Sequence, residues 1–155
     1  MKLFIEELGV VATNDIVRMF VGQPLGSGCH RSVFAHGQDS SLVVKLESGC
    51  GTFANPQEWE VWQRVCDTAF ARWFAPCLAI SGCGAALIQR RTTPVPIETL
   101  EAELPSVPAF FTDLKVGNWG RLDGRLVCHD YGNHLLYERG MTTRMRKAKW
   151  WETLP

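Results

Sequence analysis

The sequence predicts an α+β fold with an antiparallel sheet and one main helix. Residues 24–47 place β-branched and aromatic side chains between small polar ones, which is typical of strands joined by tight turns. Within residues 56–74 apolar side chains recur at helical spacing. Asp123-Gly124, between two short apolar segments, is typical of a β-hairpin turn. Strands, one helix and then more strands, in this order, predict an α+β domain with an antiparallel sheet.

The elements follow from local signals along the chain. A short helix is expected at 13–20, where Thr13 or Asn14 can cap it. Residues 37–40 form a turn, and residues 42–47 read as a strand that ends before the main helix. Pro56 suits the first position of that helix. The remaining expectations are strands at 77–81 and 86–90, an extended connector at 91–96, a short amphipathic helix at 97–104, and the hairpin around Asp123.

Composition excludes several classes of protein. The chain has 155 residues, 46% of them hydrophobic, and equal numbers of acidic and basic side chains. A net charge of zero argues against nucleic acid as a partner. No apolar run approaches the roughly 20 residues of a membrane helix, and Glu6 and Glu7 interrupt what would be the core of a signal peptide. We therefore expect a cytoplasmic protein without a membrane partner, whose six scattered cysteines are reduced rather than zinc ligands.

Motifs that are weak separately occur in an informative order. Gly26-x-Gly28 alone is an ordinary glycine turn, although such turns also bring backbone amides to phosphates. After it come Lys45 in a strand, Glu58 in a helix, Asp113-x-Lys115-x-x-Asn118, and Asp130-Tyr131-Gly132. Together the segments LGSGCHRSVF, VVKLE, NPQEWEVW, FTDLKVGNW and CHDYG resemble the protein-kinase-like superfamily. The matched segments span residues 25 to 132.

The resemblance implies an ATP site in a cleft. It implies that Gly26 and Gly28 cover the phosphates, that Lys45 contacts them, and that Glu58 pairs with Lys45. Glu60 is the less suitable acid because it would face about 200° away around the helix. Leu25 and Val33 would form an apolar roof over the adenine. Backbone groups of residues 89–93 would contact its edge.

The same resemblance implies a catalytic group. Asp113 would orient or deprotonate an acceptor hydroxyl, and Lys115 would neutralise the transferred phosphoryl group. Asn118 and Asp130 would hold Mg²⁺. Each residue also has a structural explanation when taken alone. Lys45 could be a solvated edge-strand lysine, Glu58 could lie on a solvated helix face, and the Asp and Asn residues could stabilise turns.

Some features depart from the family pattern. Arg31 replaces the third glycine of the loop, where a side chain would either crowd the nucleotide or add a positive contact. Tyr131 replaces a phenylalanine, and Phe111-Thr112 precede Asp113 where the family usually has a histidine followed by arginine or glycine. The chain is also short. We expect a single domain over 1–155, with an N-lobe at about 1–91, a hinge connector at 92–97 and a reduced C-lobe at 98–155.

A short C-lobe has few partners for its apolar side chains. They form either a compact mini-lobe or an exposed interface, which predicts self-association or a protein partner. The side chains concerned are Phe110, Phe111, Trp119, Leu135, Leu136, Tyr137, Trp150 and Trp151. The basic tail at 144–155 is expected to be an amphipathic helix that docks its tryptophans and leaves its cations in water. The alternative is that this tail binds nucleic acid.

Three functions remain open from the sequence. The first is a minimal kinase-like ATP-binding protein, a Mg²⁺-dependent phosphotransferase that acts on a hydroxyl acceptor. The second is an inactive kinase-fold module that binds and inhibits or mimics a partner protein. The third is a small α+β protein with accidental motifs. Intact Lys45, Glu58, Asp113, Asn118 and Asp130 favour the enzyme, whereas Arg31 and the missing substrate platform favour the inactive module.

Overall fold

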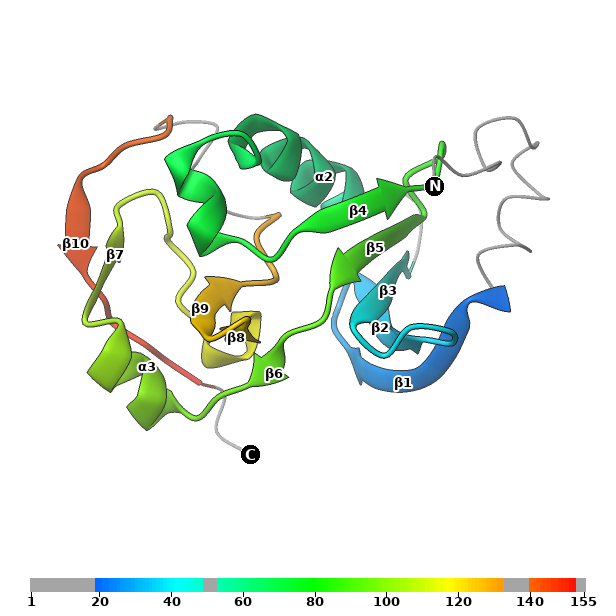
Figure 1. Ribbon diagram of the computed structural model, residues 1–155, viewed down its shortest axis with the longest axis horizontal. Coiled ribbons are helices and arrows are strands. Elements are labelled where there is room, and N and C mark those ends of the chain that lie inside the picture. Colours follow the sequence, from blue (N-terminus) through cyan, green and yellow to red (C-terminus); the bar gives the residue numbers. More distant parts are fainter. Residues whose placement is uncertain (1–18, 49–52, 133–139, 153–155) are drawn as a thin grey trace.

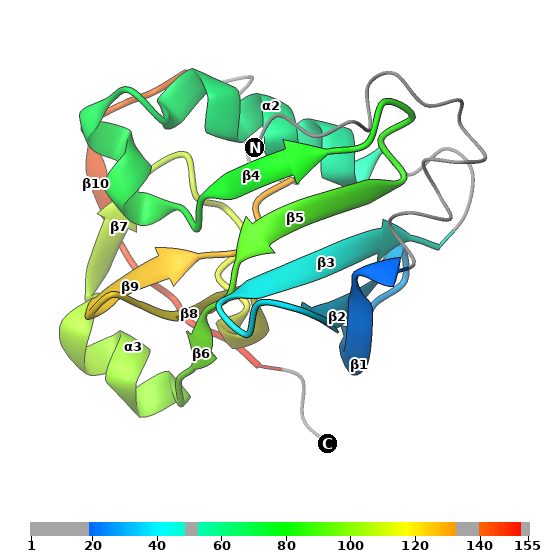
Figure 2. The ribbon, with the colours of Figure 1, turned by 45° about the vertical axis from the view of Figure 1, so that its right-hand side comes forward.

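A five-stranded antiparallel sheet forms the amino-terminal part of the computed structural model, which describes residues 19–48, 53–132 and 140–152. Its strand order is β1-β2-β3-β5-β4, and Figures 1 and 2 show β3, β5 and β4 lying side by side. The strands are β1 (Val21–Ser27), β2 (Arg31–His36), β3 (Leu42–Glu47), β4 (Cys77–Ile80) and β5 (Ala86–Arg90). Every pairing is antiparallel, so the sheet predicted from residues 24–47 and 77–90 is confirmed.

The main helix is shorter than the apolar periodicity predicts. Helix α2 (Ala54–Val65) lies over β4 and β5 (Figure 2). A turn follows it, and the chain continues as the 3-10 helix η2 (Ala69–Trp73). Thr68 makes this break, because its hydroxyl donates to Val65 O and accepts from Phe70 N. Threonine and aspartate favour such local bonds over helix continuation, so the single helix expected over 56–74 is wrong.

The carboxyl-terminal part surrounds a small hairpin. The connector carries β6 (Thr93–Pro94) and leads to helix α3 (Ile97–Glu103) and strand β7 (Ser106–Pro108). A 3-10 turn, η3 (Val116–Asn118), precedes β8 (Trp119–Leu122) and β9 (Arg125–Cys128), which pair with each other as predicted. Asp123 and Gly124 both have positive φ, 48° and 78°, which is the conformation of a two-residue hairpin turn. β6 pairs with the other edge of β8, so the connector is partly a strand.

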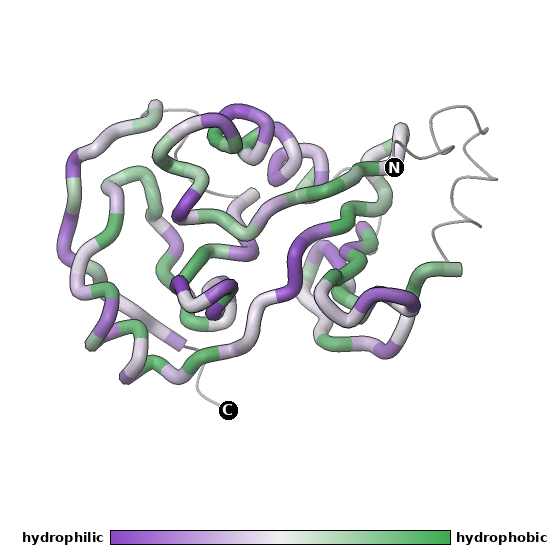
Figure 3. Tube along the Cα trace, in the orientation of Figure 1, coloured by the Kyte–Doolittle hydropathy of each residue, from purple (hydrophilic) through white to green (hydrophobic). Residues whose placement is uncertain are grey.

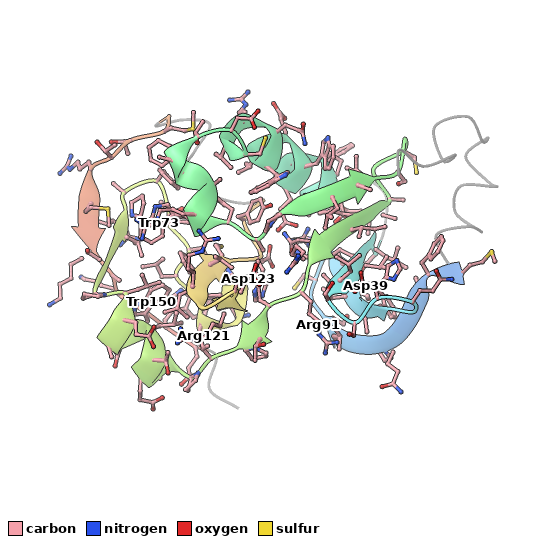
Figure 4. All side chains as sticks on the ribbon, in the orientation of Figure 1. Asp39, Trp73, Arg91, Arg121, Asp123 and Trp150 are labelled. Carbon is pink, nitrogen blue, oxygen red and sulfur yellow. The ribbon has the colours of Figure 1, made fainter. Side chains whose placement is uncertain are left out.

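One aromatic core lies between α2, the base of β4 and this hairpin. Phe110 and Phe111 are fully buried with ring centroids 4.7 Å apart, and Trp119 packs edge-on against Phe111 at 4.9 Å. Figure 4 shows Trp150 among the side chains near α3, where it packs edge-on against Trp119 at 5.1 Å. The described aromatic side chains of this part therefore form a compact mini-lobe, except for Trp151, which is 45% exposed. Leu135, Leu136 and Tyr137 lie outside the described residues.

The basic tail is not the amphipathic helix that its sequence predicts. Strand β10 (Met145–Lys147) pairs antiparallel with β7, and Trp151 then donates its amide to Leu114 O. Arg146 donates to Phe111 O at 2.5 Å, so this cation binds a carbonyl group instead of facing water. Docking of Trp150 was predicted correctly, since its indole donates to Leu104 O. The tail folds as a strand because the open edge of β7 offers it backbone partners.

Two further expectations concern the ends of the chain and the membrane. The helix predicted at 13–20 falls almost entirely on residues that lie outside the described part. No helix among residues 19–48, 53–132 and 140–152 has the length and apolarity needed to cross a membrane.

Candidate functional site

Lys45 and Glu58 form a buried ion pair beneath the sheet. Lys45 lies on β3 with its side chain on the face that carries α2, and Glu58 lies one turn into that helix. The Lys45 ammonium donates to Glu58 Oε2 at 2.9 Å and to Oε1 at 3.2 Å, and also to the carbonyl oxygen of His129. Glu58 is fully buried and Lys45 is 3% exposed. Glu60 lies on the exposed side of α2 and pairs with Arg64, so the choice of Glu58 as the partner of Lys45 is confirmed.

Arg31 supplies a second cation to the same carboxylate. It lies at the start of β2, directly after the glycine loop, and is 7% exposed. Its guanidinium donates to Glu58 Oε2 at 2.8 Å and Oε1 at 2.9 Å, which is the two-pronged geometry typical of strong arginine–carboxylate pairs. The same group donates to Asp130 Oδ1 at 2.5 Å. Arg31 therefore lies inside the site and joins two acids that are far apart in the sequence.

The segment around Asp130 is held by both its side chains and its backbone. Tyr131 donates its amide to Glu58 Oε1 at 2.9 Å, and its buried hydroxyl donates to Ala75 O at 2.8 Å. His129 and Asp130 both donate backbone amides to Asn118 O. The loop at 129–131 is thereby fixed to α2, to the base of β4 and to the η3 turn.

Charge and burial shift several pKa values in this cluster. Burial alone would raise the pKa of Glu58 and of Asp130, but neighbouring Arg31 and Lys45 lower both below their usual values. Burial alone would lower the pKa of Arg31, but the two acids raise it overall. The two carboxylates and the guanidinium are therefore ionised at neutral pH. Burial and the positive charge of Lys45 lower the pKa of His129 to about 4, so its imidazole is neutral.

The neutral imidazole of His129 has a defined proton position. Its Nε2 lies 2.9 Å from Gly117 O, which can only accept a hydrogen bond, so Nε2 carries the hydrogen. Its Nδ1 lies 2.8 Å from Thr92 Oγ1 and accepts from that hydroxyl. His129 thus links the connector after β5 to the turn that precedes β8.

A second group of candidate residues lies in the loop before η3. Asn118 donates its side-chain amide to Asp113 Oδ2 at 3.1 Å, and the backbone amide of Lys115 donates to Asp113 Oδ1 at 3.2 Å. The Lys115 ammonium lies 5.7 Å from the centre of the Trp151 ring, within the range of a cation–π contact. Val116 donates its amide to Trp151 O at 2.8 Å. The tail therefore runs beside this loop and restrains it.

These groups border one cleft between the sheet and the hairpin. The cleft encloses about 730 Å³, within the range of about 300–1,000 Å³ that is common for small-molecule sites. The chain changes from hydrophobic to hydrophilic at the end of β5, beside this cleft (Figure 3). Arg91, which lines the cleft, directly follows that strand (Figure 4). The predicted site residues that line the cleft are Leu25, Gly26, Gly28, Val33, Lys45, Lys115, Asn118 and Asp130.

Two of the predicted site residues, Glu58 and Asp113, do not line the cleft, and two backbone amides in the predicted adenine-binding segment are already hydrogen-bonded within the protein. Glu58 is fully buried behind Lys45, and Asp113 lies behind Asn118, its hydrogen-bond partner. Within the predicted adenine contacts at 89–93, the amides of Arg90 and Arg91 donate to Pro76 O and Ser41 O. These two amides are therefore not available to a ligand. Contacts from the rest of that segment stay a prediction.

Sequence reasoning missed some residues of the site. Arg31 was noted as a departure, but its two acidic partners were not foreseen, because the contacts join segments 27 and 99 residues apart. The role of His129 was missed because a histidine next to Asp130 has no distinctive spacing. Glu152, which lines the cleft, was missed because the tail was expected to be a helix. Gln89 also lines the cleft and is fully buried, and its Oε1 has no hydrogen-bond partner among the described residues.

The arrangement can hold an anionic ligand, but it does not fit a divalent cation on Asp130. In the part of the chain that the structure describes, no three His, Cys, Asp or Glu side chains are grouped as metal ligands. Asn118 and Asp130 line the same cleft, yet the charge of the Asp130 carboxylate is already compensated by Arg31 at 2.5 Å. A cation on this carboxylate would lie beside that guanidinium and be repelled by it.

Comparison with known proteins gives no family assignment. No protein-family model matches the chain, and no curated protein is similar to it at a significant level.

Proposed function

We propose that this chain is a minimal member of the protein-kinase-like superfamily, which binds ATP in the cleft and transfers its terminal phosphoryl group to a hydroxyl acceptor. The observation that carries the proposal is the position of Lys45. Its ammonium pairs with Glu58 of α2 and contacts the loop of Asp130, at a cleft that is also lined by the glycine loop. Four segments that the motifs single out thus meet at one site.

The architecture supports this proposal at a coarse level. The antiparallel sheet with α2 on one face corresponds to the expected N-lobe at 1–91. The connector at 92–97 and the described residues within 98–152 follow in the order expected for a hinge and a reduced C-lobe. Between them lies the cleft, where the superfamily holds its nucleotide.

The cleft offers suitable groups for ATP. Gly26 has no atom within 4 Å of the position that a Cβ would take, so the space beside this residue is open to an approaching phosphate, whereas the amide of Gly28 is already bonded to Arg31 O. Lys45 carries the positive charge that would contact the phosphates. Leu25 and Val33 provide apolar surface on the roof, and Leu25 is 45% exposed. The magnesium prediction for Asn118 and Asp130 is not part of this proposal, because Arg31 already compensates Asp130.

The proposed transfer step uses groups of the loop before η3. Asp113 lies next to the cleft wall, held by Asn118 and by the amide of Lys115, and would orient an acceptor hydroxyl that enters beside Asn118. Lys115 lines the cleft and would stabilise the negative charge of the transferred group.

Transfer from γ-labelled ATP tests the enzyme directly. The acceptors are the protein itself, lysate proteins and hydroxylated small molecules, each assayed with magnesium and with a chelator. We expect label transfer that Asp113→Asn reduces by at least about 100-fold while nucleotide binding is retained. Asp123→Asn in the hairpin turn is the matched control, because Asp123 is exposed and does not line the cleft. Absence of transfer to every acceptor would refute the enzymatic part of the proposal.

A second candidate function is favoured by Arg31. An inactive kinase-fold module that binds a partner protein has no need for a metal, and the neutralised Asp130 suits such a role. The two candidates differ in what Asp113→Asn does in the cell. The enzyme loses its biological effect with this substitution, whereas the inactive module retains it.

A further inference from the structure

The position of Arg31 has a direct consequence for ligand binding in the cleft. Four charged side chains meet there, with Arg31 and Lys45 as cations and Glu58 and Asp130 as anions. The charges of these four residues are balanced by the protein alone. Without Arg31 this cluster would have two acids and one lysine, and the surplus negative charge beside Asp130 would oppose a polyphosphate there unless a cation joined it, even with Lys115, Arg90 and Arg91 elsewhere on the cleft wall.

Contacts on every side fix the guanidinium of Arg31. One terminal nitrogen donates to Asn55 Oδ1 at 3.2 Å and Glu58 Oε2 at 2.8 Å, and the other donates to Glu58 Oε1 at 2.9 Å and Asp130 Oδ1 at 2.5 Å. These contacts use all four hydrogens of the two terminal nitrogens. Arg31 is therefore placed to neutralise Asp130 and not to grip a phosphate with those hydrogens.

The backbone also keeps Arg31 in this place. Its carbonyl oxygen accepts from the amide of Gly28 at 2.9 Å, which closes the glycine loop onto β2. Arg31 lies opposite Glu47 in the antiparallel backbone pairing of β2 with β3. A residue held by the loop, by the sheet and by α2 keeps its charge beside Asp130 without needing a ligand.

From these contacts we propose that the Arg31 guanidinium takes the place of a divalent cation on Asp130, so that the cleft binds a nucleoside polyphosphate without metal. The inference rests on the proposed function for the identity of the ligand. It goes further in naming the metal-free polyphosphate as the bound species and Arg31 as the residue responsible.

Calorimetric titration of the full chain with ATP, in excess EDTA and in excess MgCl₂, tests the inference without any variant. We expect the two dissociation constants to agree within about threefold. Binding that is lost in EDTA and regained with MgCl₂ would overturn the inference while leaving the proposed function intact. Absence of binding in both buffers would refute the proposed function and the named ligand together.

Variants then assign the effect to Arg31. Arg31→Gln removes the charge, and we expect it to weaken ATP binding in EDTA by at least about tenfold and to restore it with MgCl₂. The double variant Arg31→Gln/Asp130→Asn removes both charges and should bind ATP in EDTA again. If both variants bind ATP in EDTA as the natural chain does, Arg31 does not have this role. Arg31→Lys retains the charge and serves as the folded comparison if Arg31→Gln unfolds.

Titration with Mn²⁺ in the absence of ATP tests whether Arg31 keeps a metal ion off Asp130, independently of nucleotide binding. We expect no saturable Mn²⁺ binding to the natural chain, measured by water proton relaxation. Arg31→Gln should gain a site that the double variant with Asp130→Asn loses. Saturable Mn²⁺ binding to the natural chain that depends on Asp130 would overturn the inference, whatever the result with ATP.

Discussion

The ammonium of Lys45 donates to the fully buried carboxylate of Glu58 at 2.9 Å, which joins the central strand of the sheet to helix α2. Glu58 also accepts from Arg31 and from the backbone of Tyr131, so one side chain holds four segments together. A buried carboxylate that satisfies two cations and an amide is structural, and it also positions Lys45, which lines the cleft.

Replacing Glu58 with glutamine tests the structural contribution. Glu58→Gln leaves Lys45 and Arg31 buried with one acid fewer, and an uncompensated buried cation is costly. We expect the free energy of unfolding to fall by about 3 kcal/mol, measured by chemical denaturation. Glu60→Gln is the matched control on the same helix, because Glu60 is exposed and pairs with the exposed Arg64. Its expected loss is below about 0.5 kcal/mol. Equal losses in the two variants would contradict a central role for Glu58.

The pKa of His129 predicts a pH dependence of stability. Its pKa is lowered to about 4 in the folded chain, whereas an unfolded histidine titrates near 6.5. Between these values the unfolded chain binds the extra proton, so stability falls as the pH is lowered from about 6.5 towards 4. The lowered pKa values of Glu58 and Asp130 remove stability only at more acidic pH, as the carboxylates become protonated. Denaturation at about pH 7 and about pH 5 measures the effect of His129.

His129→Gln is the variant that isolates this effect. Glutamine can still donate to Gly117 O and accept from Thr92, but it does not titrate. We expect the loss of stability between the two pH values to be smaller in this variant than in the natural chain. An identical loss would assign the pH dependence to other groups.

The tail contributes to stability through Trp150. Its ring packs against Trp119 at 5.1 Å and its indole donates to Leu104 O at 3.2 Å. We expect Trp150→Ala to lower the free energy of unfolding by about 2 kcal/mol, because a half-buried aromatic ring and its hydrogen bond are lost together. Met145→Ala on the same tail is the control, since Met145 is 45% exposed. An unchanged free energy of unfolding in Trp150→Ala would show that this ring does not dock the tail.

The substitution Gly26→Ala tests nucleotide binding separately from folding. A methyl group there meets no atom within 4 Å, so Gly26→Ala should fold with a stability within about 0.5 kcal/mol of the natural chain. If the loop backbone approaches phosphates, the same methyl group weakens ATP binding by at least about threefold. Gly82→Ala is the control, because Gly82 is equally open and does not line the cleft. Unchanged ATP affinity in Gly26→Ala would exclude close contact at this position.

Local signals predicted most of the fold. The strands at 77–81 and 86–90, the helix at 97–104 and the hairpin at Asp123 all follow from short-range chemistry, and the structure confirms them. One error was local, at the break in the main helix that Thr68 makes, and the other lies where a distant segment decides the outcome. The tail forms a strand because β7 has an open edge, which no pattern within 144–155 records.

In the site, one contact between distant segments was predicted and others were not. The Lys45–Glu58 pair was predicted from motif order and is confirmed by a distance of 2.9 Å. The partners of Arg31 were not predicted, because a single arginine in place of a glycine reveals its charge but not the direction of its side chain. The roles of Asp113, Lys115 and Asn118 stay predictions, since their geometry is consistent with turn formation as well as with catalysis.

Binding of ATP to the natural chain and to Lys45→Met, measured by calorimetry, tests the central proposal most directly. Lys149→Ala on the exposed tail serves as a control of equal charge change. We expect saturable binding to the natural chain and to Lys149→Ala, and affinity at least about tenfold weaker in Lys45→Met. Equal affinity in all three proteins, or no binding to the natural chain, would contradict the assignment of this cleft as a nucleotide site.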